Sequence, residues 1–130
     1  MTIPVPHTMA TLQQHVGHDF GLSAAVPLDQ PRIDHFAECT GDAQWIHVDV
    51  ERARTQSPLG GTIAHGLLLL ALIPAAQYEL GVYPDGAASM LNYGFDKVRF
   101  LAPVPAGTRV QVRVELIEVE AKGPGRTLVR

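Results

Sequence analysis

The spacing of hydrophobic and polar positions changes along the chain and divides it into predicted elements. Ile33, Phe36 and Ala37 recur at i, i+3 and i+4, which predicts an amphipathic helix with these side chains on its buried face. Asp29 is placed to cap the start of this helix with its carboxylate, and Gly41 is placed to end it in a left-handed conformation. The sequence therefore predicts a helix between these two residues.

A second stretch, residues 64–80, is apolar on almost every side. Its run of leucine, isoleucine and alanine is typical of a helix that lies in the middle of a fold rather than on its surface. Pro74 lies inside the run and is expected to kink the helix or to begin a new segment, because proline has no N–H to donate.

Strand patterns occupy the rest of the chain. Residues 18–28 and 90–101 each predict a strand, and residues 110–116 alternate apolar with polar positions as a half-buried strand does. The alternation slips at Leu116-Ile117, which predicts a β-bulge, and a further strand begins at Thr127. This order of elements predicts one α+β domain over residues 1–130, with an antiparallel β-sheet wrapped around a long central apolar helix.

Composition excludes several classes of protein. The 130 residues hold 10 Lys and Arg against 13 Asp and Glu, a formal net charge of -3, and a nucleic-acid-binding protein would show a basic excess. No apolar run is long enough to span a membrane, and the N-terminal sequence lacks the pattern of a secretion signal, so a cytoplasmic location is expected. Cys39 is the single cysteine, which rules out an intrachain disulfide. We expect it to be a small core residue.

Candidate chemistry is concentrated between residues 41 and 66. Asp42 and His47 lie five residues apart in a predicted loop, where a carboxylate and an imidazole can work together as acid and base. Gly66 stands where the apolar helix begins and offers an unpaired backbone N–H to a developing oxyanion. This combination favours an enzyme that adds water to, or removes it from, an acyl thioester.

These residues also resemble a known family. Gly41-Asp42, Ile46-His47-Val48-Asp49 and the run from Gly61 to Gly66 (GTIAHG) are similar to the MaoC-like hydratases/dehydratases, and residues 42–49 (DAQWIHVD) look most like the NodN-like branch. The likeness covers roughly residues 30–120. It implies a hot-dog fold and the activity of an (R)-specific enoyl-CoA hydratase or 3-hydroxyacyl-CoA dehydratase. The family's acid/base pair falls on Asp42 and His47, and its thioester-binding amide falls on Gly66.

The chain departs from the family pattern in three places. Gln44-Trp45 replaces the usual Asn-Pro between the acid/base residues, which implies a reshaped acyl pocket. Pro74 replaces a serine that some members place on the central helix. The family's sheet also usually continues beyond the position of Arg130, so the last strand is expected to be truncated or supplied otherwise.

Further substrate contacts are expected around this pair. Gln44 and Trp45 line the acyl pocket, or Trp45 is a large core anchor. Ile63, Ala64 and His65 precede the amide donor, and His65 either orients the loop or acts as a second base. Lys97 and Arg99 share one strand face and either meet coenzyme A phosphates or form a solvated face. Asp49 is expected to cap a following helical turn rather than to take part in catalysis.

The expected activity needs no metal and no cofactor, because backbone amides polarise the substrate and the acyl-CoA thioester is itself the substrate. The histidines show no metal-binding spacing. We expect a homodimer active in fatty acid metabolism, without a nucleic-acid or membrane partner. The alternatives are an acyl-ACP dehydratase, a hot-dog acyl-thioesterase and a non-catalytic acyl-CoA-binding or partner module.

Overall fold

The structure is a computed structural model that describes residues 6–130. The chain forms two compact units, which are described separately here. One comprises the residues up to Ala24, Pro74–Gly94 and Val112–Arg130, and the other comprises Ala25–Ile73 and Phe95–Gln111. The organisation of residues 1–130 as a single domain stays a prediction.

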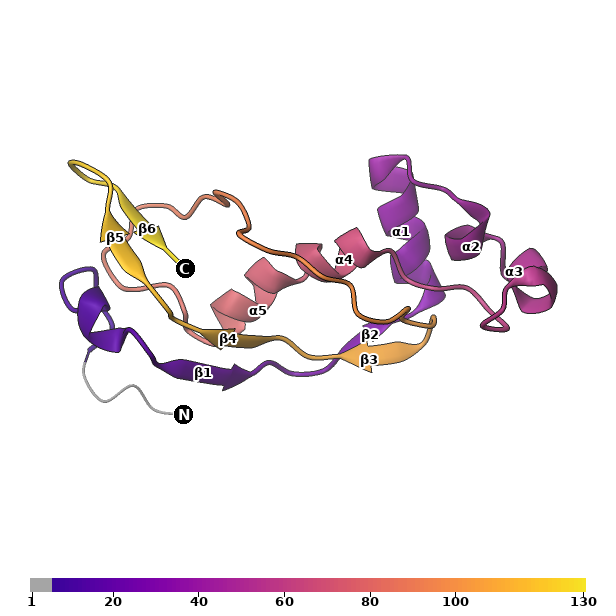
Figure 1. The fold of residues 1–130 in the computed structure, drawn as a ribbon, viewed down its shortest axis with the longest axis horizontal. Helices are drawn as coiled ribbons and strands as arrows, with labels where there is room; N and C mark the ends of the chain where they lie inside the picture. Colours follow the sequence, from indigo (N-terminus) through magenta and orange to yellow (C-terminus); the bar gives the residue numbers. More distant parts are fainter. Residues whose placement is uncertain (1–5) are drawn as a thin grey trace. The chain divides into compact units, whose positions relative to one another are not determined.

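The unit that contains residues 25–73 and 95–111 holds most of the helices. Its strands β2 (Val26–Leu28) and β3 (Thr108–Val110) pair antiparallel and lie side by side in Figure 1. Its helices are α1 (Gln30–Thr40), α2 (Trp45–Val48), α3 (Val50–Gln56) and α4 (Gly66–Ala71). Helix α1 follows directly from β2, so that the short strand pair and the first long helix form one continuous structure.

Helix α1 has the boundaries and the buried face that its sequence predicts. The Asp29 carboxylate accepts a hydrogen bond of 3.0 Å from the backbone N–H of Arg32. Gly41 ends the helix with a φ of 84°, where a residue with a side chain would be strained. Ile33 and Ala37 are buried, and Phe36 is half-buried. Both helix signals and the apolar stripe are therefore confirmed.

The core of this unit lies between α1, α4 and the strand pair. Its buried side chains are Leu28, Ile33, Ala64 and Leu68, of which Leu28 and Ile33 are fully buried. Burial of a leucine or isoleucine side chain stabilises a fold by about 1.5–3 kcal/mol, and the smaller alanine contributes less. Packing of Ala64 and Leu68 against Leu28 of β2 and Ile33 of α1 therefore fixes the position of residue 66, where α4 begins.

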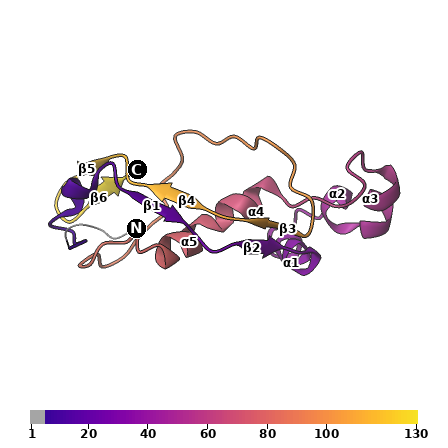
Figure 2. The ribbon, with the colours of Figure 1, turned by 90° about the horizontal axis from the view of Figure 1, so that it is seen from below.

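The other unit consists of short strand pairs and a small core. Strand β1 (Asp19–Leu22) pairs antiparallel with β4 (Arg113–Glu115), as Figure 2 shows, and β5 (Val119–Ala121) pairs with β6 (Thr127–Val129). A 3-10 helix, η1 (Leu12–His15), precedes β1, and α5 (Ile73–Glu79) supplies the remaining helix. The buried side chains of its core are Leu12, Phe20 and Leu116.

The predicted bulge after residue 116 is present. The successive backbone N–H groups of Ile117 and Glu118 both donate to the carbonyl of Arg130, at 2.8 and 3.3 Å. Ile117 and Glu118 thus face the single residue Arg130, and two residues opposite one is the hydrogen-bond pattern of a β-bulge. The slip in the apolar alternation is therefore a local feature that the sequence alone reveals.

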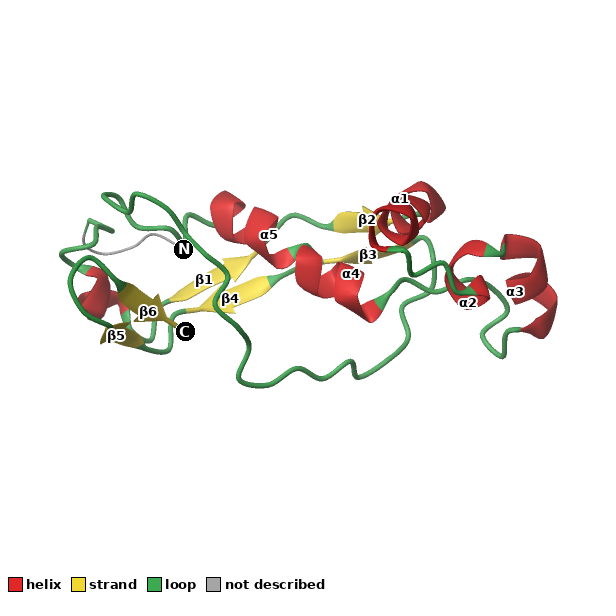
Figure 3. Cartoon of the chain, turned by 90° about the horizontal axis from the view of Figure 1, so that it is seen from above, coloured by secondary structure: helices red, strands yellow, loops and turns green. Residues whose placement is uncertain are grey.

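Two predicted strands are wrong in extent, and a third is absent. Residues 18–28 form two strands rather than one, and residues 110–116 likewise fall into parts of β3 and β4. The predicted strand at residues 90–101 is absent: between α5 and β3 the described chain contains no helix or strand, and Figure 3 shows this segment as loop. The alternation there identifies two faces of an extended segment, but a strand also requires a hydrogen-bonded neighbour.

The long central helix is not present as one helix. The apolar run is divided at Leu72 into α4 and α5, because Pro74 cannot donate the hydrogen bond that would continue α4. Within α4, Leu68 is buried whereas Leu67 is exposed. The expectation of burial on every side is therefore wrong for this chain, although the break at the proline was one of the two predicted outcomes.

Two smaller expectations also fail. Cys39 is exposed rather than a core residue, because it lies outside the stripe formed by Ile33 and Ala37 on α1. The segment from Asp42 to Asp49 is not entirely loop, since α2 forms one helical turn within it. Among the described helices, none has the length and apolar character needed to cross a membrane.

Candidate active site

His47 is presented by the single turn of α2 and is held in one orientation. Its side chain is 7% exposed, and its Nδ1 lies 2.7 Å from the backbone carbonyl of Ile63. A carbonyl only accepts hydrogen bonds, so Nδ1 carries the proton in the neutral ring and Nε2 keeps a free lone pair. The backbone N–H of Ile63 also donates to the Ile46 carbonyl at 3.0 Å, which ties α2 to the segment before α4. The ring is thus prepared to accept a proton at Nε2.

Asp42 stands beside His47 because α1 ends at Gly41. Asp42, His47 and His65 each offer one ligand atom, and these atoms all lie within 4.8 Å of one another. One water molecule at ordinary hydrogen-bond distance can therefore contact both the Asp42 carboxylate and the His47 ring. The carboxylate is exposed, whereas both histidines are buried. The Asp42 carboxylate and the His47 ring, five residues apart in sequence, are thus close together in space.

His65 makes the third member of this cluster. Its Nε2 lies 2.9 Å from the backbone carbonyl of Asp42, and its ring stacks on His47 with centroids 3.8 Å apart and planes 22° apart. The histidine spacing in the sequence did not reveal this grouping. The stack does not suit a metal ion, because in-plane lone pairs of nearly parallel rings do not converge on one point about 2.0–2.2 Å from each nitrogen. The expected absence of a metal stays a prediction.

An apolar pocket of about 300 Å³ adjoins His47 and the start of α4. It is lined by His47, Ile63, Ala64, Gly66, Leu69, Phe100, Leu101, Ala102, Pro103 and Val104. Ile63 and Ala64 were predicted as substrate contacts, and both line it. The run from Phe100 to Val104 was missed as pocket lining, because nothing in its sequence shows which element it faces.

Gly66 lies at the wall of this pocket with its backbone N–H uncommitted. In the described chain this N–H donates to no acceptor, as expected for the first turn of a helix. A Cβ on Gly66 would stand 3.0 Å from three ring atoms of Phe100. Close packing against that ring is thus a reason for glycine here that the sequence did not show. Because α4 has only six residues, the N–H itself rather than a long helix dipole is what this position offers.

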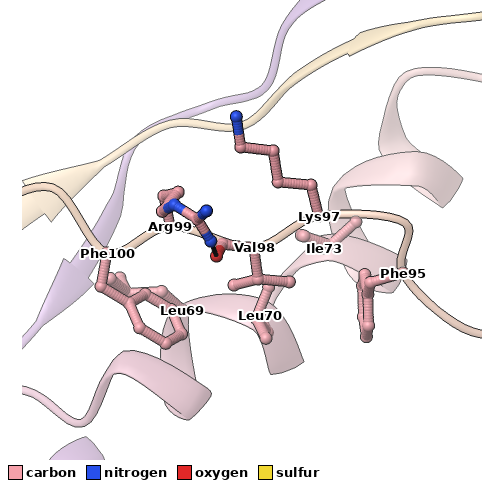
Figure 4. Close-up of a pocket in the computed structure, with 8 residues that line it drawn as sticks. All are labelled: Leu69, Leu70, Ile73, Phe95, Lys97, Val98, Arg99 and Phe100. Atoms are coloured by element: carbon pink, nitrogen blue, oxygen red, sulfur yellow. Dashed lines mark hydrogen bonds between the residues drawn. The ribbon is translucent and has the colours of Figure 1, made fainter.

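Lys97 and Arg99 border a second pocket of about 370 Å³ whose floor is formed by Leu69, Leu70 and Ile73. Figure 4 shows both cationic side chains directed away from α4, while Val98 and Phe100 point toward it. The two cations share one side of the segment, as predicted, although the segment is not a strand. Within residues 6–130 neither forms an ion pair, and Arg99 donates only to the Val98 carbonyl.

Gln44 and Trp45 line neither of these two pockets. The Arg52 guanidinium stacks over the Trp45 ring at 4.1 Å from its centroid. Asp49 caps α3 by accepting from the Arg52 N–H at 3.0 Å, which confirms its structural role. Neither predicted role of Trp45 fits this geometry: it does not line either pocket, and it is half-buried and outside the described core clusters.

Gln30 is a supporting residue that the sequence reasoning missed. Its side-chain amide donates to the His47 carbonyl at 2.8 Å, and its oxygen accepts from the Thr62 hydroxyl at 2.6 Å. The side chain therefore links α1 to α2 and to the segment that leads into α4. No motif identifies it in advance, because these partners lie 17 and 32 residues away in the chain.

Comparison with known proteins identifies the family. The model of the MaoC like domain matches residues 11–128. The chain belongs to the MaoC-like family. It is 45% identical over 118 residues to the 3-hydroxyacyl-thioester dehydratase Z of Mycobacterium tuberculosis (strain ATCC 25618 / H37Rv), covering 91% of this chain and 77% of that protein. It is 44% identical over 117 residues to Nodulation protein N of Rhizobium leguminosarum bv. viciae, covering 89% and 72%.

A solved MaoC-like relative supports the same assignment in three dimensions. The R-Hydratase PhaJ1 from Pseudomonas aeruginosa, in its unliganded form, has a TM-score of 0.64 and 29% sequence identity, covering 82% of this chain and 63% of that one. The predicted α+β class and hot-dog fold of this MaoC-like chain are confirmed. The resemblance to the NodN-like branch is likewise confirmed by the similarity to Nodulation protein N.

Proposed function

We propose that this chain is an (R)-specific enoyl-CoA hydratase or, in the reverse direction, a 3-hydroxyacyl-CoA dehydratase. The Asp42 carboxylate and the His47 ring lie close enough to hold one water molecule at the edge of an apolar pocket that Gly66 also borders. This juxtaposition carries the proposal. The names of the dehydratase and hydratase relatives agree with it.

The reaction follows from these three groups. One member of the Asp42–His47 pair removes a proton from the bound water as its oxygen bonds to C3 of the enoyl thioester. The electron pair of the double bond moves toward the thioester carbonyl, whose oxygen becomes enolate-like. The Gly66 N–H donates to this oxygen, and the pair returns a proton to C2. The product contains every atom of the enoyl thioester and of one water, so the reaction balances without a co-reactant.

The apolar pocket gives the acyl chain a place beside the reacting atoms. Its walls are aliphatic apart from Phe100 and His47, so it favours a hydrocarbon tail over a polar one. A tail buried there places C2 and C3 near the start of α4, where the uncommitted amide lies. The pocket thus supports an acyl thioester rather than a small hydrophilic substrate.

Coenzyme A is the carrier that we propose on the other side of the thioester. Lys97 and Arg99 have no carboxylate partner in the described chain, and both project from the segment that ends in Phe100. Arg52 and Arg54 are less suited, since Arg52 stacks on Trp45 and Arg54 pairs with Glu51. Two free cations close to the apolar pocket favour a phosphate-bearing carrier.

We also infer a homodimer and a cytoplasmic location. Large apolar side chains such as Leu101, which is 91% exposed, and Phe95 stand in solvent on the isolated chain, and a second copy would cover them. The free, exposed thiol of Cys39 suits a reducing compartment.

The test is hydration of crotonyl-CoA, followed by loss of the enoyl absorbance and by chiral analysis of the 3-hydroxy product. Asp42→Asn removes the carboxylate charge at an exposed position, and His47→Asn keeps a donor near the Nδ1 position for the Ile63 carbonyl while removing Nε2. Each variant is expected to lose about 10²–10⁴-fold in kcat while its melting temperature stays close to wild type. Glu38→Gln, on the exposed face of α1, is the matched control and should keep full activity.

Three results would contradict the assignment. A folded Asp42→Asn or His47→Asn protein with near-wild-type hydration would exclude the pair as acid and base. An (S)-configured product would overturn the stereochemical proposal. Release of free thiol from a saturated acyl-CoA, without hydration of the enoyl substrate, would indicate a thioesterase instead.

A further inference from the structure

His65 is buried beside the acid/base pair but has no part in the reaction as described above. It is 2% exposed and lies immediately before α4, outside the lining of both pockets described. Its predicted role as a substrate contact is therefore not what its position supports. What it contacts is the catalytic pair itself: the backbone of Asp42 and the ring of His47.

The hydrogen bond to Asp42 decides the tautomer of His65. Its Nε2 faces the Asp42 carbonyl at 2.9 Å, and a carbonyl can only accept, so Nε2 carries the proton. Nδ1 is left as a buried acceptor, and within the described residues it has no hydrogen-bond partner. The neutral ring with its proton on Nε2 is thus the form that the geometry holds.

This hydrogen bond tethers the peptide that carries the catalytic carboxylate. Asp42 follows the end of α1, and its own backbone N–H is held only by a 3.3 Å bond to the Thr40 hydroxyl. The hydrogen bond from His65, which is 23 residues away in the chain, reaches the Asp42 carbonyl on the other side of the Asp42 Cα atom. The hydrogen bond fixes the backbone from which the Asp42 carboxylate extends, and a productive acid/base geometry tolerates displacements of only about 0.5 Å.

The ring of His65 also restricts His47. The two rings stack at 3.8 Å, and Phe36 contacts His65 with ring centroids 4.9 Å apart. His47 is therefore held by its bond to the Ile63 carbonyl and by the face of His65, while His65 is held by Asp42 and α1. One side chain thus connects both members of the pair.

We propose that His65 is a positioning residue of the proposed hydration, and that it acts mainly through Asp42. The inference rests on the proposed function. His65 holds the Asp42 peptide through Nε2–H and supports the His47 ring by stacking. It neither contacts the substrate nor exchanges a proton during the reaction.

Two substitutions separate the tether from the stack. His65→Phe keeps an aromatic ring against His47 and removes the donor, whereas His65→Gln keeps an N–H at about the position of Nε2 and removes the ring. Crotonyl-CoA hydration by each variant is measured in the wild-type background and in the Asp42→Asn background. Melting temperatures of all the proteins are recorded alongside.

His65→Phe should lower kcat about 10- to 100-fold with KM changed less than about 3-fold, because misplacement of a catalytic group costs turnover rather than binding. His65→Gln should fall by less than about 5-fold. In the Asp42→Asn background His65→Phe should change kcat by less than about 2-fold, because the carboxylate that it positions is already gone. The proposal would be overturned if the His65→Phe and Asp42→Asn losses in kcat multiplied fully in the double variant. Equal losses in kcat for His65→Gln and His65→Phe would also overturn it.

A measurement on the wild-type protein needs neither activity nor a folded variant. Long-range ¹H–¹⁵N correlation spectra of the histidine rings should show His65 as the Nε2–H tautomer, and a proton found on Nδ1 would refute the tether. Failure of the proposed function is recognised separately, since wild-type protein would then not hydrate crotonyl-CoA at all.

Discussion

Gly66→Ala tests whether the start of α4 supplies the amide that binds the thioester oxygen. The added Cβ would point at the Phe100 ring, with three ring atoms at 3.0 Å. Ordinary carbon–carbon contact begins near 3.5 Å, so the ring must retreat by about 0.5 Å or more. Because Phe100 is 52% exposed, it has room to do so.

The expected effect on stability is small because two terms oppose each other. Overpacking against a rigid neighbour costs about 1–3 kcal/mol, and a half-exposed ring that can move brings the cost to the low end of that range. Alanine in place of glycine in a helix returns up to about 1 kcal/mol. The free energy of unfolding should therefore change by no more than about 1 kcal/mol.

The expected effect on activity is much larger. The methyl group and the displaced ring both intrude on the pocket beside the N–H that would bind the oxyanion. Loss of one such donor costs about 10²–10³-fold in kcat, so a decrease of about 10²-fold is expected for a donor that is obstructed. Crotonyl-CoA hydration measures the activity, and urea denaturation followed by circular dichroism measures the stability.

Gly61→Ala is the matched control on the segment that leads to α4. A Cβ there meets nothing within 4 Å, so both activity and stability should stay near wild type. A folded Gly66→Ala protein with unchanged kcat would refute the assignment of the amide. A loss of several kcal/mol in stability would instead show that Phe100 cannot yield, which contradicts the packing argument.

Three further predictions follow from other parts of the chain. Leu68→Ala should cost about 2–4 kcal/mol in urea denaturation because Leu68 is 5% exposed in the core, whereas Leu67→Ala, at 62% exposed, should cost less than about 0.5 kcal/mol; equal costs would contradict the assigned core. Arg99→Glu should raise KM for crotonyl-CoA about fivefold at low salt, equivalent to about 1 kcal/mol, and high salt should reduce the effect; an unchanged low-salt KM would exclude the phosphate contact. The hydrogen bond from Arg113 lowers the pKa of Asp19 below its ordinary 3.8, so the stabilisation is present above that value and is lost as pH falls through the lowered folded-state pKa. The difference in melting temperature between wild type and Asp19→Asn should accordingly be greatest near neutral pH and disappear in acid; a constant difference would refute this origin.

Helix α1 shows what kind of feature sequence reasoning predicts well. Each of its features depends on two residues that are at most four positions apart. Asp29 caps the N–H of Arg32, Gly41 bonds to the carbonyl of Ala37, and Ile33 and Ala37 form the buried stripe. Backbone geometry converts such short spacings directly into structure. The same holds for the cap that Asp49 provides to α3.

Features that depend on distant neighbours were predicted poorly. The alternation of residues 90–101 correctly placed Lys97 and Arg99 on one side, yet the segment has no strand partner in the described chain. That missing partner is not encoded in local spacing. The expected core position of Cys39 fails for a different, local reason: Cys39 is exposed because it lies off the α1 stripe that Ile33 and Ala37 define.

The candidate site divides in the same way. Residue types, their order and the resemblance to the MaoC-like family together nominate Asp42, His47 and Gly66, since an acid, a base and a helix start within 25 positions form a pattern that can be read along the chain. The partners that orient them are set by packing: the Ile63 carbonyl on His47, the stacked ring of His65, and Phe100 over Gly66. Each of these contacts joins segments 16 or more residues apart, and only the folded core brings such segments together. The chain's local order thus nominates the groups that are candidates for the chemistry, and packing of its core specifies how they face one another.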